Sequence, residues 1–203
     1  MIPGIILAAG RSTRMGESKA LLPIAPGRQG PTFLTHLATT LLEGGAIDLV
    51  VVTRADDRAV HQEIDALGTR ARCVINAHAD DGQLSSLLAG LDAVDRPGVH
   101  GIIVTPVDVP FVRATTVRAL LATGQSGHAA IVRPTHHGRH GHPVLFMRRV
   151  FDELRRADRS VGAKAVVRAH AHDLIDLEVD DPGVLHDIDS PEDYARAIDA
   201  ATN

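Results

Sequence analysis

Apolar runs of strand length alternate with amphipathic stretches of helical length along almost the whole chain. Short apolar runs are typical of buried strands, and apolar residues that repeat every three or four positions are typical of helices that cover a sheet. The pattern predicts strands at residues 2–8, 49–53, 72–75, 102–106, 129–133, 143–146 and 174–178. It predicts helices at residues 33–43, 57–67, 84–93, 114–122, 150–156, 163–170 and 191–201. This alternation indicates an α/β fold, a single domain over residues 1–203 with a doubly wound, mostly parallel sheet between two helical layers.

Composition and charge exclude several classes of protein. The 203 residues are 44% hydrophobic and 23% charged, which suits one compact core, and no apolar run is long enough to span a bilayer. A formal net charge of −4, with four Phe, one Tyr and no Trp, provides neither the basic stripe nor the stacking aromatics of a nucleic-acid-binding protein. The N-terminus lacks the features of a signal peptide, and the single Cys73 cannot form an internal disulfide. We therefore expect a cytoplasmic protein that binds neither nucleic acid nor a membrane.

A glycine-rich stretch follows the first predicted strand. Residues 7–19 read L-A-A-G-R-S-T-R-M-G-E-S-K. Small residues at Ala8, Ala9 and Gly10 let backbone amides approach an anion, and positive charge comes from Arg11, Arg14 and Lys19. These cations favour a polyphosphate-binding loop over an ordinary surface loop. The spacing matches neither a P-loop nor G-x-G-x-x-G, which disfavours a simple ATPase or a dinucleotide-dependent oxidoreductase.

Carboxylates lie after the central predicted strand and before the last predicted helix. Asp108 stands between two prolines in T-P-V-D-V-P, at the strand end where ligands bind in open α/β sheets. In the later run H-D-I-D-S-P-E-D, the S-P-E-D portion fits a helix N-terminus. Asp187 and Asp189 remain, and their side chains point the same way if the segment is extended. Because Mg²⁺ takes oxygen ligands, these residues form a candidate magnesium site; the alternative is a proline turn and a helix cap without metal.

Polar residues also occur where another strand gives way to a helix. The run G-Q-L-S-S-L begins at Gly82, and helix N-terminal amides and hydroxyls can hold a phosphate or read a base edge. For Ser85 and Ser86, helix capping is the alternative role. The histidine-rich run at 136–142 contains no interleaved Cys or carboxylate, so a polar loop between two strands is favoured there over a zinc site.

These motifs resemble, in the same order, those of the MobA-like NTP transferase family. The glycine-rich stretch is similar to the family signature L-A-A-G-x-S-x-R-M-G, which is followed by Lys and a Leu-Pro segment. Residues 138–146, G-R-H-G-H-P-V-L-F, are similar to the G-R-x-G-x-P-V-L-F run of the molybdopterin cytidylyltransferase branch. The resemblance extends from Leu7 to Tyr194. Val109 is a departure, because some members of that branch have Gln in its place.

The resemblance implies a Rossmann-like, GT-A-like nucleotidyltransferase fold and a set of site residues. Expected catalytic residues are Arg14, Lys19 and Asp108, with the magnesium ion on Asp108 and on Asp189 or Asp187, of which Asp189 is favoured. Expected nucleotide contacts are Leu7, Ala8, Ala9, Gly10, Arg11, Arg14, Lys19, Asn76, Gly82, Ser85 and Ser86. Expected acceptor contacts are Arg139, Gly141 and His142. The implied substrates are a nucleoside triphosphate, CTP favoured, and a small phosphorylated acceptor of the molybdopterin type. A molybdoenzyme or its maturation factor is the implied protein partner.

The expected chemistry needs charge neutralisation more than proton transfer. A phosphate monoester of the acceptor is already anionic near neutral pH, so it can attack the α-phosphorus without a general base. The site must align the reactants and neutralise charge as pyrophosphate leaves, which Mg²⁺, Arg14 and Lys19 can do.

Other functions remain open at this point. Sugar phosphates or methylerythritol phosphate are alternative acceptors for the same reaction. From other classes, the protein could be a non-catalytic carrier of a pterin or nucleotide, or an NAD(P)-dependent oxidoreductase that uses the same cleft. Retention of Lys19, Asp108 and Asp189 disfavours the carrier, and the absence of an acidic ribose-binding residue after a G-x-G-x-x-G turn disfavours the oxidoreductase.

Overall fold

The computed structural model describes residues 1–13, 15–25 and 30–202. These residues form an eight-stranded sheet in the order β3-β2-β1-β4-β7-β5-β6, with β8 beside β5. The strands are β1 (Gly4–Leu7), β2 (Leu49–Thr53), β3 (Ala71–Ile75), β4 (Gly101–Pro106), β5 (Ile131–His136), β6 (Arg139–His140), β7 (Val144–Met147) and β8 (Leu174–Glu178). The pairs β1/β2, β1/β4, β2/β3 and β5/β8 are parallel. Strand β7 runs antiparallel to both β4 and β5.

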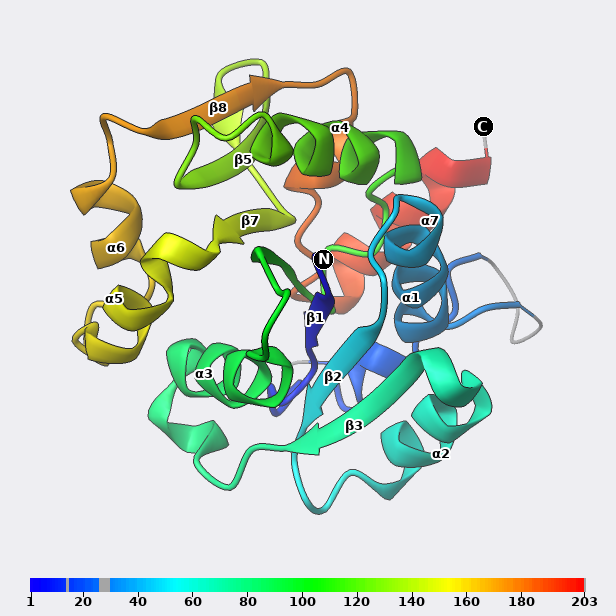
Figure 1. The fold of residues 1–203 in the computed structure, drawn as a ribbon. Coiled ribbons are helices and arrows are strands. Elements are labelled where there is room, and N and C mark those ends of the chain that lie inside the picture. Colours follow the sequence, from blue (N-terminus) through cyan, green and yellow to red (C-terminus); the bar gives the residue numbers. More distant parts are fainter. Residues whose placement is uncertain (14, 26–29, 203) are drawn as a thin grey trace.

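Helices cover both faces of the sheet (Figure 1). They are α1 (Phe33–Glu43), α2 (Arg58–Ala66), α3 (Gln83–Val94), α4 (Ala114–Gln125), α5 (Phe151–Arg156), α6 (Lys164–Ala169) and α7 (Pro191–Thr202). Short 3₁₀ turns lie at η1 (Lys19–Leu21), η2 (Gly68–Arg70), η3 (Ala79–Asp81), η4 (Arg148–Val150) and η5 (Pro182–Leu185). No helix within the described part of the chain is both long and apolar enough to cross a membrane.

Alternation of side chains along the strands divides the core into two clusters. Ile6, Val51 and Ile103 face the cluster that contains the buried sides of α1, α2 and α4. Ile5 and Val50 face the other cluster, which contains those of α3, α5 and α6. Successive strand residues point to opposite faces of a sheet, so continuous apolar strands such as β2 are buried on both sides, as the sequence pattern predicts for a doubly wound sheet.

The predicted order of strands and helices is confirmed, with one difference around the histidine-rich run. The sequence predicts a loop after residue 133, but β5 continues to His136 and pairs with the two-residue strand β6. Alternation of polar and apolar residues is weak in this hairpin, so the pattern alone did not reveal it. The chain then returns as β7 between β4 and β5, which explains the antiparallel strand within a mostly parallel sheet.

Helix ends agree with their local sequence. Thr32 caps α1 through a reciprocal pair of bonds with Thr35, and Asp57 accepts from the amide of Val60 at the start of α2. Gly44 ends α1, and Gly45 follows with a φ of 111°, a conformation that favours glycine. The caps at Thr32 and Asp57 fix the helix starts on the carboxyl side of the sheet, where the candidate site lies.

Candidate active site

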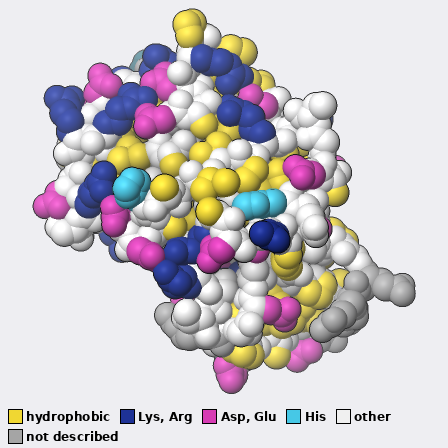
Figure 2. Space-filling view, turned by 90° about the horizontal axis from the view of Figure 1, so that it is seen from below, with side chains coloured by type: hydrophobic (Ala, Val, Ile, Leu, Met, Phe, Trp, Pro, Cys, Tyr) yellow, Lys and Arg dark blue, Asp and Glu magenta, His cyan; other side chains and the backbone are white. Residues whose placement is uncertain are grey.

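A cavity of about 350 Å³ opens at the carboxyl ends of β1 and β4. Nine of the predicted site residues line it: Leu7, Ala8, Ala9, Gly10, Lys19, Gly82, Ser86, Asp108 and Asp189. Ser12, Thr13, Ser18 and Gln83 are among its other lining residues. In Figure 1 the carboxyl ends of β1 and β2 point downwards, so Figure 2, viewed from below, shows this face of the molecule. The structure thus brings together segments that the sequence places far apart.

Lys19 lies at the base of this cavity and connects two acidic segments. Its Nζ lies 2.6 Å from Oδ1 of Asp189 and 3.1 Å from Oδ2 of Asp108. The lysine stands at the start of η1, and its backbone amide donates to the hydroxyl of Ser12. Although burial lowers the pKa of Lys19, the two carboxylates more than offset this effect, and the pKa is raised. Lys19 is therefore a fixed, fully charged ammonium group.

Asp108 and the segment that carries Asp187 and Asp189 meet at the sheet edge beside Lys19. The backbone of Asp108, just after β4, accepts a hydrogen bond from the amide of Ile188, and this contact brings the segment before α7 to the sheet edge. Ser190 and Asp193 begin α7 by exchanging side-chain and backbone hydrogen bonds, as the sequence predicts for this cap. Asp189 then reaches into the cavity, whereas Asp187 is exposed and does not line it.

The charge of this cluster fits a divalent cation. Burial raises the pKa of Asp187, and the nearby charges of Asp108 and Asp189 raise it further, against an opposite effect of Lys19. Three carboxylates facing one ammonium leave excess negative charge, and hard oxygen donors are the ligands that Mg²⁺ and Mn²⁺ prefer. Asp108, Asp189 and Asp187 are thus residues able to hold such an ion.

Replacing Asp187 by Asn is expected to stabilise the metal-free protein. Because its pKa is raised on folding, the ionised carboxylate costs stability at pH values above that pKa, and the cost disappears as the pH falls below the ordinary carboxyl range. Because Asp187 is only partly shielded from solvent, which screens its charge, we expect a modest rise in Tm at neutral pH, roughly 2 °C, that vanishes in acid. Thermal unfolding with EDTA across a pH series measures it, and an equal gain at every pH would contradict the electrostatic cause.

Arg11 is held by a network that the sequence did not predict. Its guanidinium forms two hydrogen bonds to Asp80, at 2.8 and 3.0 Å. Arg54, which follows β2, donates to Asp80 at 3.2 Å and to the carbonyl of Ala9 at 3.4 Å. The hydrogen bonds from Arg11 and Arg54 hold the pKa of Asp80 well below its usual range. This network ties the glycine-rich loop to η3; Arg14 lies outside the described residues.

The polar residues at the start of α3 form two layers. The amide Nδ2 of Asn76 donates to the hydroxyls of Ser85 and Ser86, at 2.8 and 3.0 Å. Ser85 in turn donates to the backbone of Gly82 and lies behind the cavity wall with Asn76. Ser86, Gly82 and Gln83 face the cavity. Nucleotide contact by Asn76 and Ser85 stays a prediction, and the structure gives them a supporting position behind the cavity wall.

A second cavity, of about 690 Å³, adjoins the first and shares Leu7, Gln83 and Pro106 with it. Gly141 and His142, two predicted acceptor contacts, line this cavity, whereas the exposed Arg139 on β6 does not. Burial lowers the pKa of His142, so its imidazole is neutral at neutral pH. Figure 2 shows apolar side chains gathered in the middle of this face, with Lys and Arg side chains nearby.

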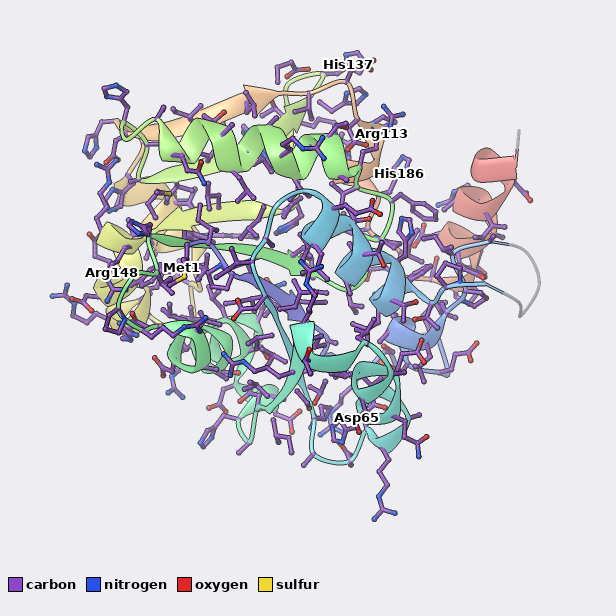
Figure 3. All side chains as sticks on the ribbon, turned by 45° about the vertical axis from the view of Figure 1, so that its right-hand side comes forward. Met1, Asp65, Arg113, His137, Arg148 and His186 are labelled. Carbon is purple, nitrogen blue, oxygen red and sulfur yellow. The ribbon has the colours of Figure 1, made fainter. Side chains whose placement is uncertain are left out.

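Of the other histidines of the 136–142 run, His140 lines the second cavity, whereas His136 and His137 line neither cavity. His137 stands at the outer edge of the molecule (Figure 3), and His136 bonds through Nδ1 to the carbonyl of Val179. Within the described ranges, the one group of three potential metal-ligand side chains that lie close together is His170, His172 and Asp173. Both ring nitrogens of His170 are already engaged, one by Asp173 and the other by Glu153.

Gly141 is expected to be required for the shape of the second cavity. A Cβ at this position would collide with the backbone carbonyl of Val184. We expect Gly141→Ala to lower the free energy of unfolding by about 2 kcal/mol and Tm by about 6 °C. Gly10→Ala is the matched control, because a Cβ there meets open space; its Tm should change by less than about 2 °C. Equal Tm values for both variants would contradict the proposed collision.

Comparison with known proteins assigns the chain to a family. The model of the MobA-like NTP transferase domain matches residues 4–174. The chain belongs to this family. The fold and the resemblance predicted from the sequence are thereby confirmed.

Several known proteins align with nearly the whole chain. Nicotine blue oxidoreductase of Paenarthrobacter nicotinovorans is 32% identical, with coverage of 97% of this chain and 96% of that protein. A probable molybdenum cofactor guanylyltransferase of Opitutus terrae is 27% identical, and the match covers 96% of this chain and 94% of that protein. The molybdenum cofactor cytidylyltransferase of Escherichia coli is 26% identical, and the match covers 98% of this chain and 96% of that protein. The structure of Rv0371c from Mycobacterium tuberculosis in complex with manganese has a TM-score of 0.76 and 28% identity, covering 98% of each chain.

Proposed function

We propose that this protein transfers a nucleotidyl group, CMP favoured, from a nucleoside triphosphate to a small phosphorylated acceptor, with Mg²⁺ and release of pyrophosphate. The acceptor that we favour is of the molybdopterin type. The observation that carries this proposal is the meeting of Lys19, Asp108 and Asp189 at the glycine-rich cavity, directly beside a second, larger cavity. One cavity has the elements to hold a triphosphate, and the other has room for the molecule that attacks it.

The residues of the first cavity would bind and align the triphosphate. Backbone amides of Ala8 to Gly10 can approach its phosphates, since no large side chain covers them. Lys19 would neutralise charge that develops as the bond from the α-phosphorus to the leaving oxygen breaks. The acceptor oxygen forms the new bond to the α-phosphorus, and pyrophosphate leaves. The attacking phosphate is already anionic, so no side chain must take a proton from it.

Asp108 is the residue that we assign as the principal metal ligand, with Asp189 as the second. Both carboxylates line the cavity and contact Lys19, whereas Asp187 lies beside them without lining it. A bound Mg²⁺ would supply positive charge to the triphosphate and help to orient it. The manganese complex of a similar protein supports a divalent ion in this family.

The choice of CTP and of a molybdopterin-type acceptor rests on similarity rather than on one side chain. Residues 138–146 match the cytidylyltransferase run, and they lead into β7 beside the second cavity. A cytidylyltransferase and a guanylyltransferase are similar to this chain at nearly equal identity. If the acceptor is of this type, a molybdoenzyme or its maturation factor is the expected recipient of the product.

Pyrophosphate release tests this proposal. The protein is incubated with CTP, GTP, ATP or UTP, each with and without molybdopterin and a panel of sugar phosphates, in the presence of Mg²⁺ or EDTA. We expect release that needs the metal and one acceptor and is fastest with CTP. Release with a sugar phosphate alone would keep the transferase and replace the acceptor. No release with any pair, despite nucleotide binding, would contradict the proposed activity and favour a carrier.

An oxidoreductase is the second candidate, because nicotine blue oxidoreductase is 32% identical over almost the whole chain. Under this alternative the paired cavities would hold a nicotinamide cofactor and a flat aromatic acceptor. The test is to mix the protein with nicotine blue and NADPH or NADH and to monitor oxidation of the nicotinamide by its absorbance. Turnover that persists in EDTA and in Lys19→Ala would favour this function over nucleotidyl transfer.

A further inference from the structure

The second cavity has an unusual charge for this protein. Four cationic side chains, Arg133, Arg159, Lys164 and Arg168, are among its lining residues, and no described Asp or Glu is. The chain as a whole has a formal net charge of −4. The first cavity differs, because there Lys19 faces Asp108 and Asp189. An anionic ligand would therefore meet a favourable potential in the second cavity.

Two of the four cations have carboxylate partners, and two do not. Arg133 forms a two-bond pair with Asp176, and Arg159 contacts Asp81 at 2.9 Å. Lys164 and Arg168 form no ion pair with any residue that the structure describes. They stand four positions apart on α6, a spacing that places both side chains on one face of the helix. Their charges are thus available to a ligand in the cavity.

Most of the remaining lining residues are apolar, and one polar atom among them lacks a partner within the described part of the chain. Leu87, Val144 and Phe146 are buried lining residues, and Val161 is 44% exposed at the cavity. The Nδ1 atom of His142 is buried and has no hydrogen-bond partner among the described residues. Gln83 and Ser160 also line the cavity and offer polar contacts to a ligand. The cavity therefore offers contacts to an apolar body, a polar edge and a negative group.

We propose that the acceptor has an apolar body and carries a second anionic group, distinct from the phosphate that attacks, and that Lys164 and Arg168 bind this group. This inference rests on the proposed function, because it treats the second cavity as the acceptor site. Leu7, Gln83 and Pro106 line both cavities and mark the side at which the attacking phosphate must lie. Lys164 and Arg168 line the second cavity alone, so they would hold the acceptor by another part of the molecule.

A pair of fluorescent probes that differ by one charge tests the inference without any turnover. Anilinonaphthalenesulfonate has a flat apolar body and an anionic group, and phenylnaphthylamine has the same body without the charge. Each is titrated into the wild-type protein, free of nucleotide and metal, and into the variant with Lys164→Ala and Arg168→Ala. We expect the double variant to bind the sulfonate about tenfold more weakly and the neutral probe equally well. In the wild type, high salt should weaken the binding of the sulfonate and leave the binding of the neutral probe unchanged.

Arg156→Ala provides the matched control, because Arg156 is an exposed arginine on the neighbouring helix α5 that does not line the cavity. Its sulfonate affinity should equal that of the wild type. The inference would be overturned if the double variant kept its affinity for the sulfonate or lost affinity for both probes equally. It would also be overturned if neither probe bound to the wild type. Pyrophosphate release is measured separately: loss of probe discrimination with no release from any triphosphate would support the anionic site and reject the transferase.

Discussion

Lys19→Ala is expected to reduce the turnover of nucleotidyl transfer by a factor of about 10²–10³ without unfolding the protein. The ammonium group lies between Asp108 and Asp189, and it is the one Lys or Arg side chain among the described residues that line this cavity. Both carboxylates retain contact with solvent, so their loss of a partner should cost little stability. Initial rates at saturating triphosphate, together with the circular dichroism spectrum, measure the two effects.

Lys19→Arg is the matched variant, because it keeps the charge and changes only its shape and position. We expect its turnover to lie between those of the wild type and Lys19→Ala. If Lys19→Ala retained most of the wild-type rate, Lys19 would hold the two acidic segments together without acting on the phosphates. If Lys19→Ala lost the circular dichroism spectrum of the folded protein while Lys19→Arg stayed fully active, the charge of Lys19 would serve folding. That result would also contradict its proposed catalytic role.

Asp108→Asn is expected to remove activity to a similar extent and to weaken divalent metal binding by at least about tenfold. Asn keeps the size of the side chain but lacks the charge that a divalent cation requires. Mn²⁺ affinity can be measured by calorimetry or by electron paramagnetic resonance on the free protein. The effect should appear with metal alone, before any nucleotide is added.

Asp65→Asn is a control for the loss of one negative charge. Asp65 is exposed on α2, at the outer end of the molecule in Figure 3, and should leave Mn²⁺ affinity and turnover unchanged. Asp189→Asn should resemble Asp108→Asn, and Asp187→Asn should weaken the metal less. An unchanged Mn²⁺ affinity in Asp108→Asn would contradict its assignment as the principal ligand, and a larger effect of Asp187→Asn would exchange the roles of Asp187 and Asp189.

The sequence predicted the fold and the meeting of the main candidate residues because both depend on local patterns. Continuous apolar strands followed by amphipathic helices require a doubly wound sheet, and a sheet of parallel strands collects their carboxyl ends at one edge. Lys19 and Asp108 belong to motifs that follow β1 and β4, and the segment of Asp189 reaches the same edge through the hydrogen bond from Ile188 to Asp108. The structure places them in contact although 89 and 170 positions separate Lys19 from its two partners.

Contacts that depend on the exact position of loops could not be predicted in this way. Arg54 and Asp80 belong to no recognised motif, and their pairing with Arg11 requires the end of β2, η3 and the glycine-rich loop to meet. Asn76 belongs to a predicted nucleotide site, but a sequence does not reveal that its amide is used by Ser85. The charge of the second cavity was missed for the same reason, since its cations come from two separate parts of the chain, Arg133 on β5 and the segment 159–168.

Transfer of the α-phosphate label of CTP tests the central proposal most directly. The protein is incubated with Mg²⁺, molybdopterin and CTP carrying ³²P at the α-phosphorus, and the products are separated by chromatography. We predict that the label moves into a product that also contains the pterin, at a rate equal to that of pyrophosphate release, and that EDTA and Lys19→Ala prevent it. Label that remains in CTP, or that appears only as free CMP, with every triphosphate and phosphorylated acceptor tested would contradict nucleotidyl transfer by this protein.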